Sequence, residues 1–130
     1  MTSVVLDASA LIAVLRREPG ADIVRKRLNG ALISAVNYSE VLKKTIEVGG
    51  VPGLVQAYVQ NISLEIVAFD EEQAAASAAL YPKTKPHGMS FADRACLALG
   101  IKQGADVFTT ERKMGLVELP IKVKLIRGQH

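Results

Sequence analysis

The sequence predicts an α/β fold with a mainly parallel central sheet that is covered by helices on both faces. Short apolar runs alternate with longer segments of helical period along the chain, and Pro, Gly and Asn-Gly signals separate them. This alternation is typical of βαβ units, whose crossover helices cover the sheet. With 130 residues and no repeat or long linker, the chain is expected to form one domain over residues 1–130.

Strands and helices are expected to follow one another in a regular order. The strands are predicted at residues 3–6, 31–34, 65–68, 106–109 and 123–126. The helices are predicted at residues 8–17, 21–28, 36–48, 52–61, 70–80 and 90–103, with a short helical turn at 111–114.

Proline, glycine and capping residues predict where these helices begin and end. The first three helices are closed by Pro19-Gly20, Asn29-Gly30 and Gly49-Gly50. Pro52 stands in the first turn of the next helix, where its missing N–H is tolerated. Asp70 is expected to cap the alanine-rich helix that follows. A Pro- and Gly-rich stretch predicts a loop over residues 82–89, and Gly104 closes the last long helix.

Composition limits the classes of function. No apolar run reaches the roughly 18 residues of a membrane span, and the start lacks the pattern of a signal peptide. The single Cys96 excludes an internal disulfide framework, which fits a cytoplasmic location. One Cys and two His are too few and too badly spaced for a structural zinc site. A metal ion in this protein would therefore need oxygen ligands.

The positive charge of the chain is mild and clustered. A net charge of +3 and a pI of about 9.1 permit a phosphate-rich partner without requiring one. The lack of Trp and the 5% aromatic content argue against base stacking, so a nucleic acid would be contacted mainly at its phosphates. The simplest interpretation of each basic cluster is a solvated helix face. The clusters are Arg16-Arg17, Arg25-Lys26-Arg27, Lys43-Lys44 and Arg112-Lys113.

Four acidic residues lie near predicted helix starts, namely Asp7, Glu40, Asp93 and Glu111. Helix capping alone explains acids at such places, because free N–H groups and the helix dipole favour them. The stretches 37–40 and 90–93 both resemble capping boxes. Lys43 and Lys44 are also well spaced to pair with Glu40 on a helix surface.

Two of these acids are expected to be buried, which capping does not require. Asp7 ends a strand that should be central, and Asp93 shares an apolar helix side with Cys96 and Leu97. Two unit charges ~4 Å apart repel by about 4 kcal/mol at an effective dielectric constant near 20. A cleft with several carboxylates therefore needs protonation or a cation. Hard oxygen ligands favour Mg²⁺ or Mn²⁺.

Four stretches resemble, in order and spacing, the motifs of PIN-domain ribonucleases. They are VVLDASALI at 4–12, ISAV with SEV at 33–41, SFADR with LA at 90–98, and VFTTER at 107–112. The resemblance extends over nearly the whole chain, from the first of these stretches to the last. The length of the chain is also similar to that of VapC-type toxins of bacterial and archaeal toxin–antitoxin modules. The specific signal is the order of the motifs inside the strand–helix alternation, since each motif is short.

The resemblance implies a single PIN-like domain and a metal-dependent endoribonuclease. Asp7, Glu40, Asp93 and Glu111 would be catalytic and hold one or two Mg²⁺ or Mn²⁺ ions, which activate water for attack on the RNA phosphodiester. The family usually has Asp where this chain has Glu111, so this ligand is longer by one methylene. The residues expected to support the ligands or contact phosphate are Ser9, Thr109, Thr110 and Arg112, with Arg94 as a further candidate.

The resemblance also implies partners. An RNA substrate, a cognate antitoxin protein and a second copy of the chain in a homodimer are expected, whereas a membrane is not. The tail of the antitoxin would lie along a groove made by the helices predicted between residues 8 and 61, and it can place a basic side chain among the acids.

Two other functions are open at this point. Haloacid-dehalogenase-type phosphatases also carry an Asp after the first strand, but their chemistry needs a second Asp two residues on, where Ser9 stands. A PIN-like fold that has lost catalysis would instead serve as a binding module. The residues expected to lie outside the site are Cys96 in the core, His87 in a surface loop, and Asp22, Asp70 and Asp106.

Overall fold

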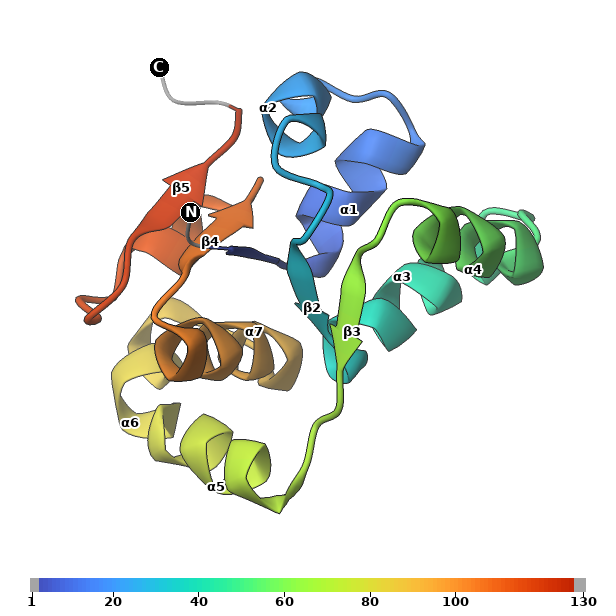
Figure 1. The fold of residues 1–130 in the computed structure, drawn as a ribbon. Coiled ribbons are helices and arrows are strands. Elements are labelled where there is room, and N and C mark those ends of the chain that lie inside the picture. The colour runs from blue at the N-terminus through green and yellow to red at the C-terminus, as the bar shows by residue number, and fades with distance from the viewer. Residues whose placement is uncertain (1–2, 128–130) are drawn as a thin grey trace.

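Five parallel strands form one sheet in the order β3-β2-β1-β4-β5 in the computed structural model, which describes residues 3–127 (Figure 1). The strands are β1 (Val4–Leu6), β2 (Leu32–Ser34), β3 (Glu65–Val67), β4 (Asp106–Thr109) and β5 (Val123–Leu125). Val5 of the central β1 pairs with Leu32 on one side and Val107 on the other. The parallel sheet that the sequence predicts is therefore confirmed, and the first strand is central.

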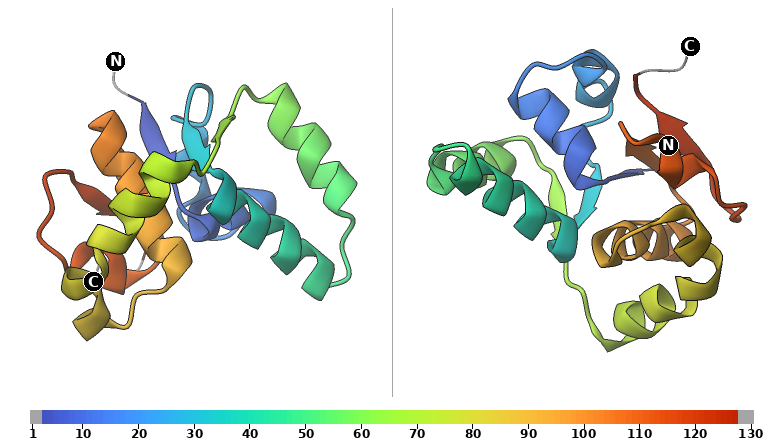
Figure 2. Two further views of the ribbon diagram at one scale, coloured as in Figure 1. Left: turned by 90° about the horizontal axis from the view of Figure 1, so that it is seen from below. Right: turned by 180° about the vertical axis from the view of Figure 1, so that it is seen from behind.

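Helices cover both faces of the sheet, as predicted (Figure 2). Because side chains alternate along a strand, Val4 and Leu6 face one layer and Val5 faces the other. The first layer consists of α1 (Ala8–Leu15), α2 (Ala21–Arg25), α3 (Ala35–Glu47) and α4 (Pro52–Asn61). The remaining helices are α5 (Glu71–Ala79), α6 (Tyr81–Thr84), η1 (Lys85–His87), α7 (Phe91–Gln103) and η2 (Arg112–Gly115). Of these, α7 packs directly on the second face.

The predicted loop at 82–89 is wrong, because α6 and the 3-10 helix η1 occupy most of it. Pro82 and Pro86 stand in the first turns of these helices, where a missing N–H leaves no hydrogen bond unmade. The buried Thr84 hydroxyl also donates to the Leu80 carbonyl at 2.9 Å. Proline therefore starts these short helices instead of breaking them.

Helix ends differ from the predicted ones mainly in the first two helices. The helix predicted over 8–17 ends at Leu15, and Arg17 adopts a left-handed φ of 55°. Its chain reversal lets the Glu18 N–H donate to the Ala13 carbonyl at 2.8 Å. The helix predicted over 21–28 ends at Arg25. Most of the other ends lie within one or two residues of the prediction.

Close packing seats α7 against the sheet. A Cβ atom on Gly100 would lie only 2.7 Å from Cγ2 of Val107 and 2.9 Å from Cδ1 of Ile121, so only glycine fits there without a shift. Gly104 then ends α7 in the left-handed conformation, and β4 follows. Because α7 runs antiparallel to the strands, its first turn lies at the carboxyl edge of the sheet, where β1 and β4 end.

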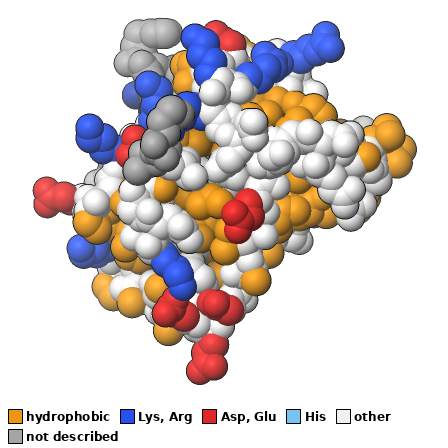
Figure 3. Space-filling view, viewed as in Figure 1, with side chains coloured by type: hydrophobic (Ala, Val, Ile, Leu, Met, Phe, Trp, Pro, Cys, Tyr) orange, Lys and Arg blue, Asp and Glu red, His pale blue; other side chains and the backbone are white. Residues whose placement is uncertain are grey.

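Charge is unevenly distributed on the surface. Lys and Arg side chains gather near α1 and α2, and Asp and Glu side chains gather near α5, with apolar side chains between them (Figure 3). Most of the basic residues in the clusters at 16–17 and 25–27 are exposed, which confirms their interpretation as solvated faces. Within residues 3–127, no helix has the length and apolar character needed to cross a bilayer.

Candidate active site

Asp7 joins the end of β1 to the start of α1 and is only 3% exposed. One carboxylate oxygen, Oδ1, accepts hydrogen bonds from the Ser9 hydroxyl at 2.6 Å and from the Ala10 N–H at 2.9 Å. The other, Oδ2, accepts from the Thr109 hydroxyl at 2.5 Å. Asp7 is thus both a helix cap and a buried carboxylate, as the sequence indicates, and it connects β1 to β4.

The same hydroxyls extend this network to the turn after β4. The Ser9 hydroxyl accepts from the N–H of Thr110 at 3.0 Å, and the Thr109 hydroxyl accepts from the N–H of Glu111 at 3.0 Å. Ser9 and Thr109 therefore touch Asp7 directly, in line with the supporting role expected of them. Thr110 contributes its backbone N–H to this network.

Burial raises the pKa of the Asp7 carboxyl from 3.8 to about 6. Hydrogen bonds from Ser9, Thr109 and Ala10 lower this pKa, and the charge of Glu111 raises it further. The buried Cys96 thiol also has a raised pKa, first because of its burial and then because of the charges of Asp7 and Asp93. The charges of Asp7 and Asp93 thus act electrostatically on the same thiol.

Asp93 lies in the first turn of α7 and is 6% exposed. Its Oδ2 accepts from the Ser90 N–H at 2.9 Å, and its own N–H donates to the Ser90 hydroxyl at 3.2 Å, which forms the predicted capping box. The same Oδ2 lies 3.2 Å from Nζ of Lys113. Lys113 Nζ also lies 3.7 Å from Oε1 of Glu111. One ammonium group therefore bridges two of the predicted ligands.

The pKa of Lys113 reflects this bridge. Partial burial lowers the pKa of the ammonium, but its contacts with Asp93 and Glu111 raise it more, and the net direction is upward. Lys113 is thus held in its charged form between the two carboxylates.

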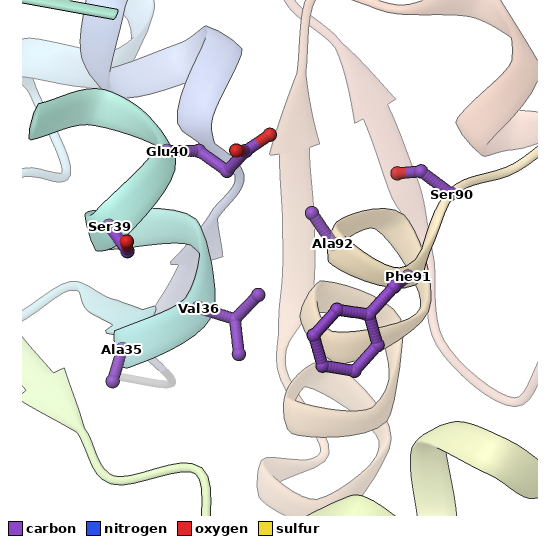
Figure 4. Close-up of a pocket in the computed structure, with 7 residues that line it drawn as sticks. All are labelled: Ala35, Val36, Ser39, Glu40, Ser90, Phe91 and Ala92. Atoms are coloured by element: carbon purple, nitrogen blue, oxygen red, sulfur yellow. The ribbon is translucent and has the colours of Figure 1, made fainter. Parts of the chain in front are cut away.

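Glu40 lies on the exposed side of α3. It lines a pocket of about 590 Å³ between α3 and α7, and Figure 4 shows its side chain directed toward this gap, with Ser90 on the far side. The capping and salt-bridge explanations for Glu40 are both wrong. Ser34 caps α3, and Lys43 and Lys44 pair with Glu47.

The four acids do not meet at a single point. Among residues 3–127, no three His, Cys, Asp or Glu side chains are grouped closely enough to hold an ion. Carboxylate oxygens are nevertheless the ligand type that Mg²⁺ and Mn²⁺ prefer, and the bridging ammonium shows that a cation is stabilised between Asp93 and Glu111. The donor set therefore fits a hard divalent cation in chemistry, with Asp7 deepest and Glu40 at the rim.

Two residues of this region were not identified from the sequence. The sequence places Lys113 in a basic cluster whose simplest interpretation is a solvated helix face, although its place two residues after Glu111 is a usable signal. Asn37 is 2% exposed and donates from Nδ2 to the Ala92 carbonyl at 3.0 Å, which ties α3 to α7 beside Glu40. Its Oδ1 is buried without a partner among the described residues.

The two arginines expected to contact phosphate lie on different elements, Arg112 on η2 and Arg94 on α7. Arg112 is exposed on η2, where its expected phosphate contact stays a prediction. The guanidinium of Arg94 lies 5.3 Å from the centre of the Tyr81 ring, a cation–π arrangement. The residues predicted to lie outside the site include Cys96, which is buried, His87, which is exposed, and Asp70, which caps α5.

Several solved structures with a similar fold are named as toxins or toxin–antitoxin complexes. A toxin–antitoxin complex from Klebsiella pneumoniae aligns with a TM-score of 0.74 at 17% identity, over 93% of this chain and 100% of that chain. The DNA-bound VapBC complex from Salmonella typhimurium aligns with a TM-score of 0.71 at 17% identity, over 95% and 98%. VapC20 of Mycobacterium tuberculosis, a toxin that cleaves the sarcin–ricin loop, aligns with a TM-score of 0.72 at 14% identity, over 86% and 92%.

Sequence comparison identifies the family. No curated protein matches the sequence. The family model for the PIN domain, however, matches residues 4–118, which include Asp7, Glu40, Asp93 and Glu111. Because this match extends over most of the 130 residues and the sheet has the predicted parallel order, the chain belongs to the PIN domain family.

Proposed function

We propose that this PIN domain is a metal-dependent endoribonuclease and the toxin of a toxin–antitoxin pair. The observation that carries the proposal is the placement of Asp7, Asp93 and Glu111 around the carboxyl ends of β1 and β4. The ammonium of Lys113 bridges two of them, Asp93 and Glu111. Open parallel sheets bind ligands at this edge. The similar fold of a toxin that cleaves the sarcin–ricin loop supports RNA as the substrate class.

In this proposal, Asp7, Asp93 and Glu111 would hold one or two Mg²⁺ or Mn²⁺ ions, and Glu40 would contribute from across the pocket. The chemistry supplied by such an ion is activation of water and neutralisation of charge on the phosphodiester. Ser9 and Thr109 fix the orientation of the Asp7 carboxylate and favour its ionised form, since their hydrogen bonds lower its pKa. No side-chain nucleophile is needed.

The pocket between α3 and α7 gives the substrate a way in. Glu40, Ser39 and Ser90 supply polar groups along it, while Phe91 is 50% exposed at its wall. We assign the RNA backbone to this opening, because it leads from solvent to the first turn of α7, where Asp93 lies. Arg112 is proposed to contact phosphate there.

An antitoxin partner is proposed on the layer formed by α1 to α4, at a groove away from the pocket between α3 and α7. An apolar groove of about 450 Å³ runs between α1 and α4, where Leu15, Val55 and Tyr58 line it. Val51 and Leu54 at its side are 59% and 71% exposed. The neighbouring structures from Klebsiella pneumoniae and Salmonella typhimurium are toxin–antitoxin complexes, and we propose that an antitoxin segment covers this groove. A homodimer and a cytoplasmic location stay predictions.

The first experiment measures RNA cleavage with Mn²⁺ or Mg²⁺, with and without EDTA, on tRNA, rRNA and mRNA substrates. Wild type should cleave only with the metal, and Asp93→Asn should reduce the rate by about 100-fold or more, because a ligand and its charge are lost. Asp70→Asn is the matched control, since it makes the same change at a helix cap outside the site and should leave cleavage unchanged.

Other outcomes would point to the alternatives. Cleavage that survives both chelation and Asp93→Asn would contradict the metal-nuclease proposal. An absence of cleavage together with tight partner binding would favour a binding module. Covalent phosphorylation of Asp7 would favour the phosphatase, although the family assignment and Ser9, which donates to Asp7, already disfavour it.

A further inference from the structure

Lys113 occupies an unusual position for a residue in a basic surface cluster. Its Nζ lies 3.2 Å from Oδ2 of Asp93 and 3.7 Å from Oε1 of Glu111. The side chain of Asp93 is only 9% exposed, so its attraction to the ammonium is weakly screened by water. The ammonium therefore lies where a divalent ion held by the same two carboxylates would have to bind.

The backbone holds Lys113 near this position. It lies in η2, whose next residue, Met114, is fully buried in the core beneath the sheet. The turn before it is fixed by the hydrogen bond from the Glu111 N–H to the Thr109 hydroxyl. The Cα of Lys113 is thus tied to the same network that orients Asp7.

The side chain, in contrast, is free to leave. It is 34% exposed and ends a flexible stem of four methylenes, so rotation can carry the ammonium into solvent. An exposed lysine regains its hydration there, and the two carboxylates become available to another cation.

We propose that Lys113 is an internal counter-ion: its ammonium neutralises Asp93 and Glu111 in the metal-free chain, and a divalent ion must displace it to bind. The inference rests on the proposed metal site. It adds that metal affinity is weakened by a cation within the chain, and that this residue sets the concentration at which the ion binds.

Two substitutions separate this role from a general effect of charge. Lys113→Met removes the ammonium but keeps an unbranched side chain, and it should bind Mn²⁺ about tenfold more tightly, since the competing charge is gone. Lys113→Arg keeps the charge and should stay within about threefold of wild type. Lys102→Met is the matched control, because it removes a lysine that pairs with Glu72 on the surface of α5 and α7.

The measurement is Mn²⁺ binding, followed by the EPR signal of free Mn²⁺ and by calorimetry, on the full chain without RNA. Thermal unfolding in EDTA should show Lys113→Met less stable than wild type, because Asp93 and Glu111 then repel each other without a cation between them. Saturating Mn²⁺ should raise the midpoint of Lys113→Met more than that of wild type. Lys113→Gln repeats the test with a polar side chain.

The outcomes are distinct. The proposal is supported if Lys113→Met and Lys113→Gln bind Mn²⁺ more tightly than wild type while Lys113→Arg and Lys102→Met do not. Unchanged or weaker binding in both variants, with wild type still binding Mn²⁺, overturns the role of Lys113 and leaves the metal site standing. If neither wild type nor the variants bind Mn²⁺, then the metal site and the counter-ion role both fail. A gain of equal size in Lys102→Met would show a general charge effect and would also overturn the role of Lys113.

Discussion

Asp7 and Asp93 are carboxylates at the same edge of the sheet, and they are buried almost equally, with 3% and 6% of each residue exposed. Their surroundings differ in kind. Asp7 receives its hydrogen bonds from two hydroxyls and one N–H, all of them neutral groups. Asp93 accepts from the N–H of Ser90 and in addition lies beside the ammonium of Lys113.

This difference shows that hydrogen bonds alone do not offset the burial of a charge. Three donors to Asp7 lower its pKa, yet burial still raises the pKa to about 6. Among residues 3–127, Lys113 supplies a cation to Asp93, whereas Asp7 takes part in no ion pair. Of these two carboxylates, Asp7 is therefore the one whose burial is less compensated, and it would gain more from a bound ion.

The largest effect is expected for Asp7→Asn. Between pH 3.8 and about 6, the folded chain keeps a proton on Asp7 that the unfolded chain has released. The free energy of unfolding of wild type therefore falls as the pH rises through this window, by about 3 kcal/mol, and stays lower at neutral pH. Asp7→Asn should lack this loss. Urea unfolding of both proteins in EDTA, at intervals from about pH 4 to about pH 7.5, measures the difference.

Asp70→Asn serves as the control, because it makes the same substitution at an exposed cap of α5, outside the network of Asp7, so the fall in stability that depends on Asp7 should remain in this variant. A constant gap between wild type and Asp7→Asn over the whole range would mean that Asp7 ionises as it does in water. The contrast drawn with Asp93 would then be lost.

A smaller effect is expected when the hydroxyl of Thr109 is removed. Thr109→Val keeps the shape of a fully buried side chain but leaves Oδ2 of Asp7 and the N–H of Glu111 without their partner. We expect a loss of about 2 kcal/mol in the free energy of unfolding at neutral pH. The pKa of Asp7 should rise further, because the hydrogen bond from Thr109 lowers it.

Thr84→Val is the matched control for this substitution. Thr84 is also fully buried, but its hydroxyl donates to the Leu80 carbonyl instead of a carboxylate. Thr84→Val should lower the free energy of unfolding by about 1 kcal/mol without changing its dependence on pH. Equal losses and equal pH profiles in the two variants would show that the Thr109 hydroxyl makes only an ordinary buried hydrogen bond and does not act on the charge of Asp7.

The sequence predicts the fold well because periodicity and helix stops are local signals. The burial of Asp7 follows from its place after a central strand, and the capping box of Asp93 follows from Ser90 three residues earlier. The helix α6 is not predicted by the sequence, because proline indicates a helix break unless it is known to stand in the first turn, as Pro82 does. Whether Pro82 starts or breaks a helix therefore depends on where that helix begins.

The site is harder to predict because it depends on how side chains from different helices and strands are oriented in the folded chain. The place of Lys113 two residues after Glu111 indicates a contact with that carboxylate, but no local signal shows that Lys113 also reaches Asp93, since that contact joins η2 to the start of α7. Glu40 presents the reverse case. Its motif predicts a place in the site, and the fold adds that its side chain enters from α3, across the pocket from Ser90.

The smallest effect is expected for Ser90→Ala, which tests the surroundings of Asp93 alone. The substitution removes the hydroxyl that accepts from the Asp93 N–H at 3.2 Å, but the Ser90 N–H still donates to Oδ2. Because Lys113 continues to neutralise Asp93, only the helix cap is lost, at about 1 kcal/mol of unfolding free energy. Ser34→Ala, at the cap of α3, should cost a similar amount in the same urea titration. A loss of more than about 3 kcal/mol, found for Ser90→Ala and not for Ser34→Ala, would mean that Ser90 and not Lys113 holds the charge of Asp93 in place.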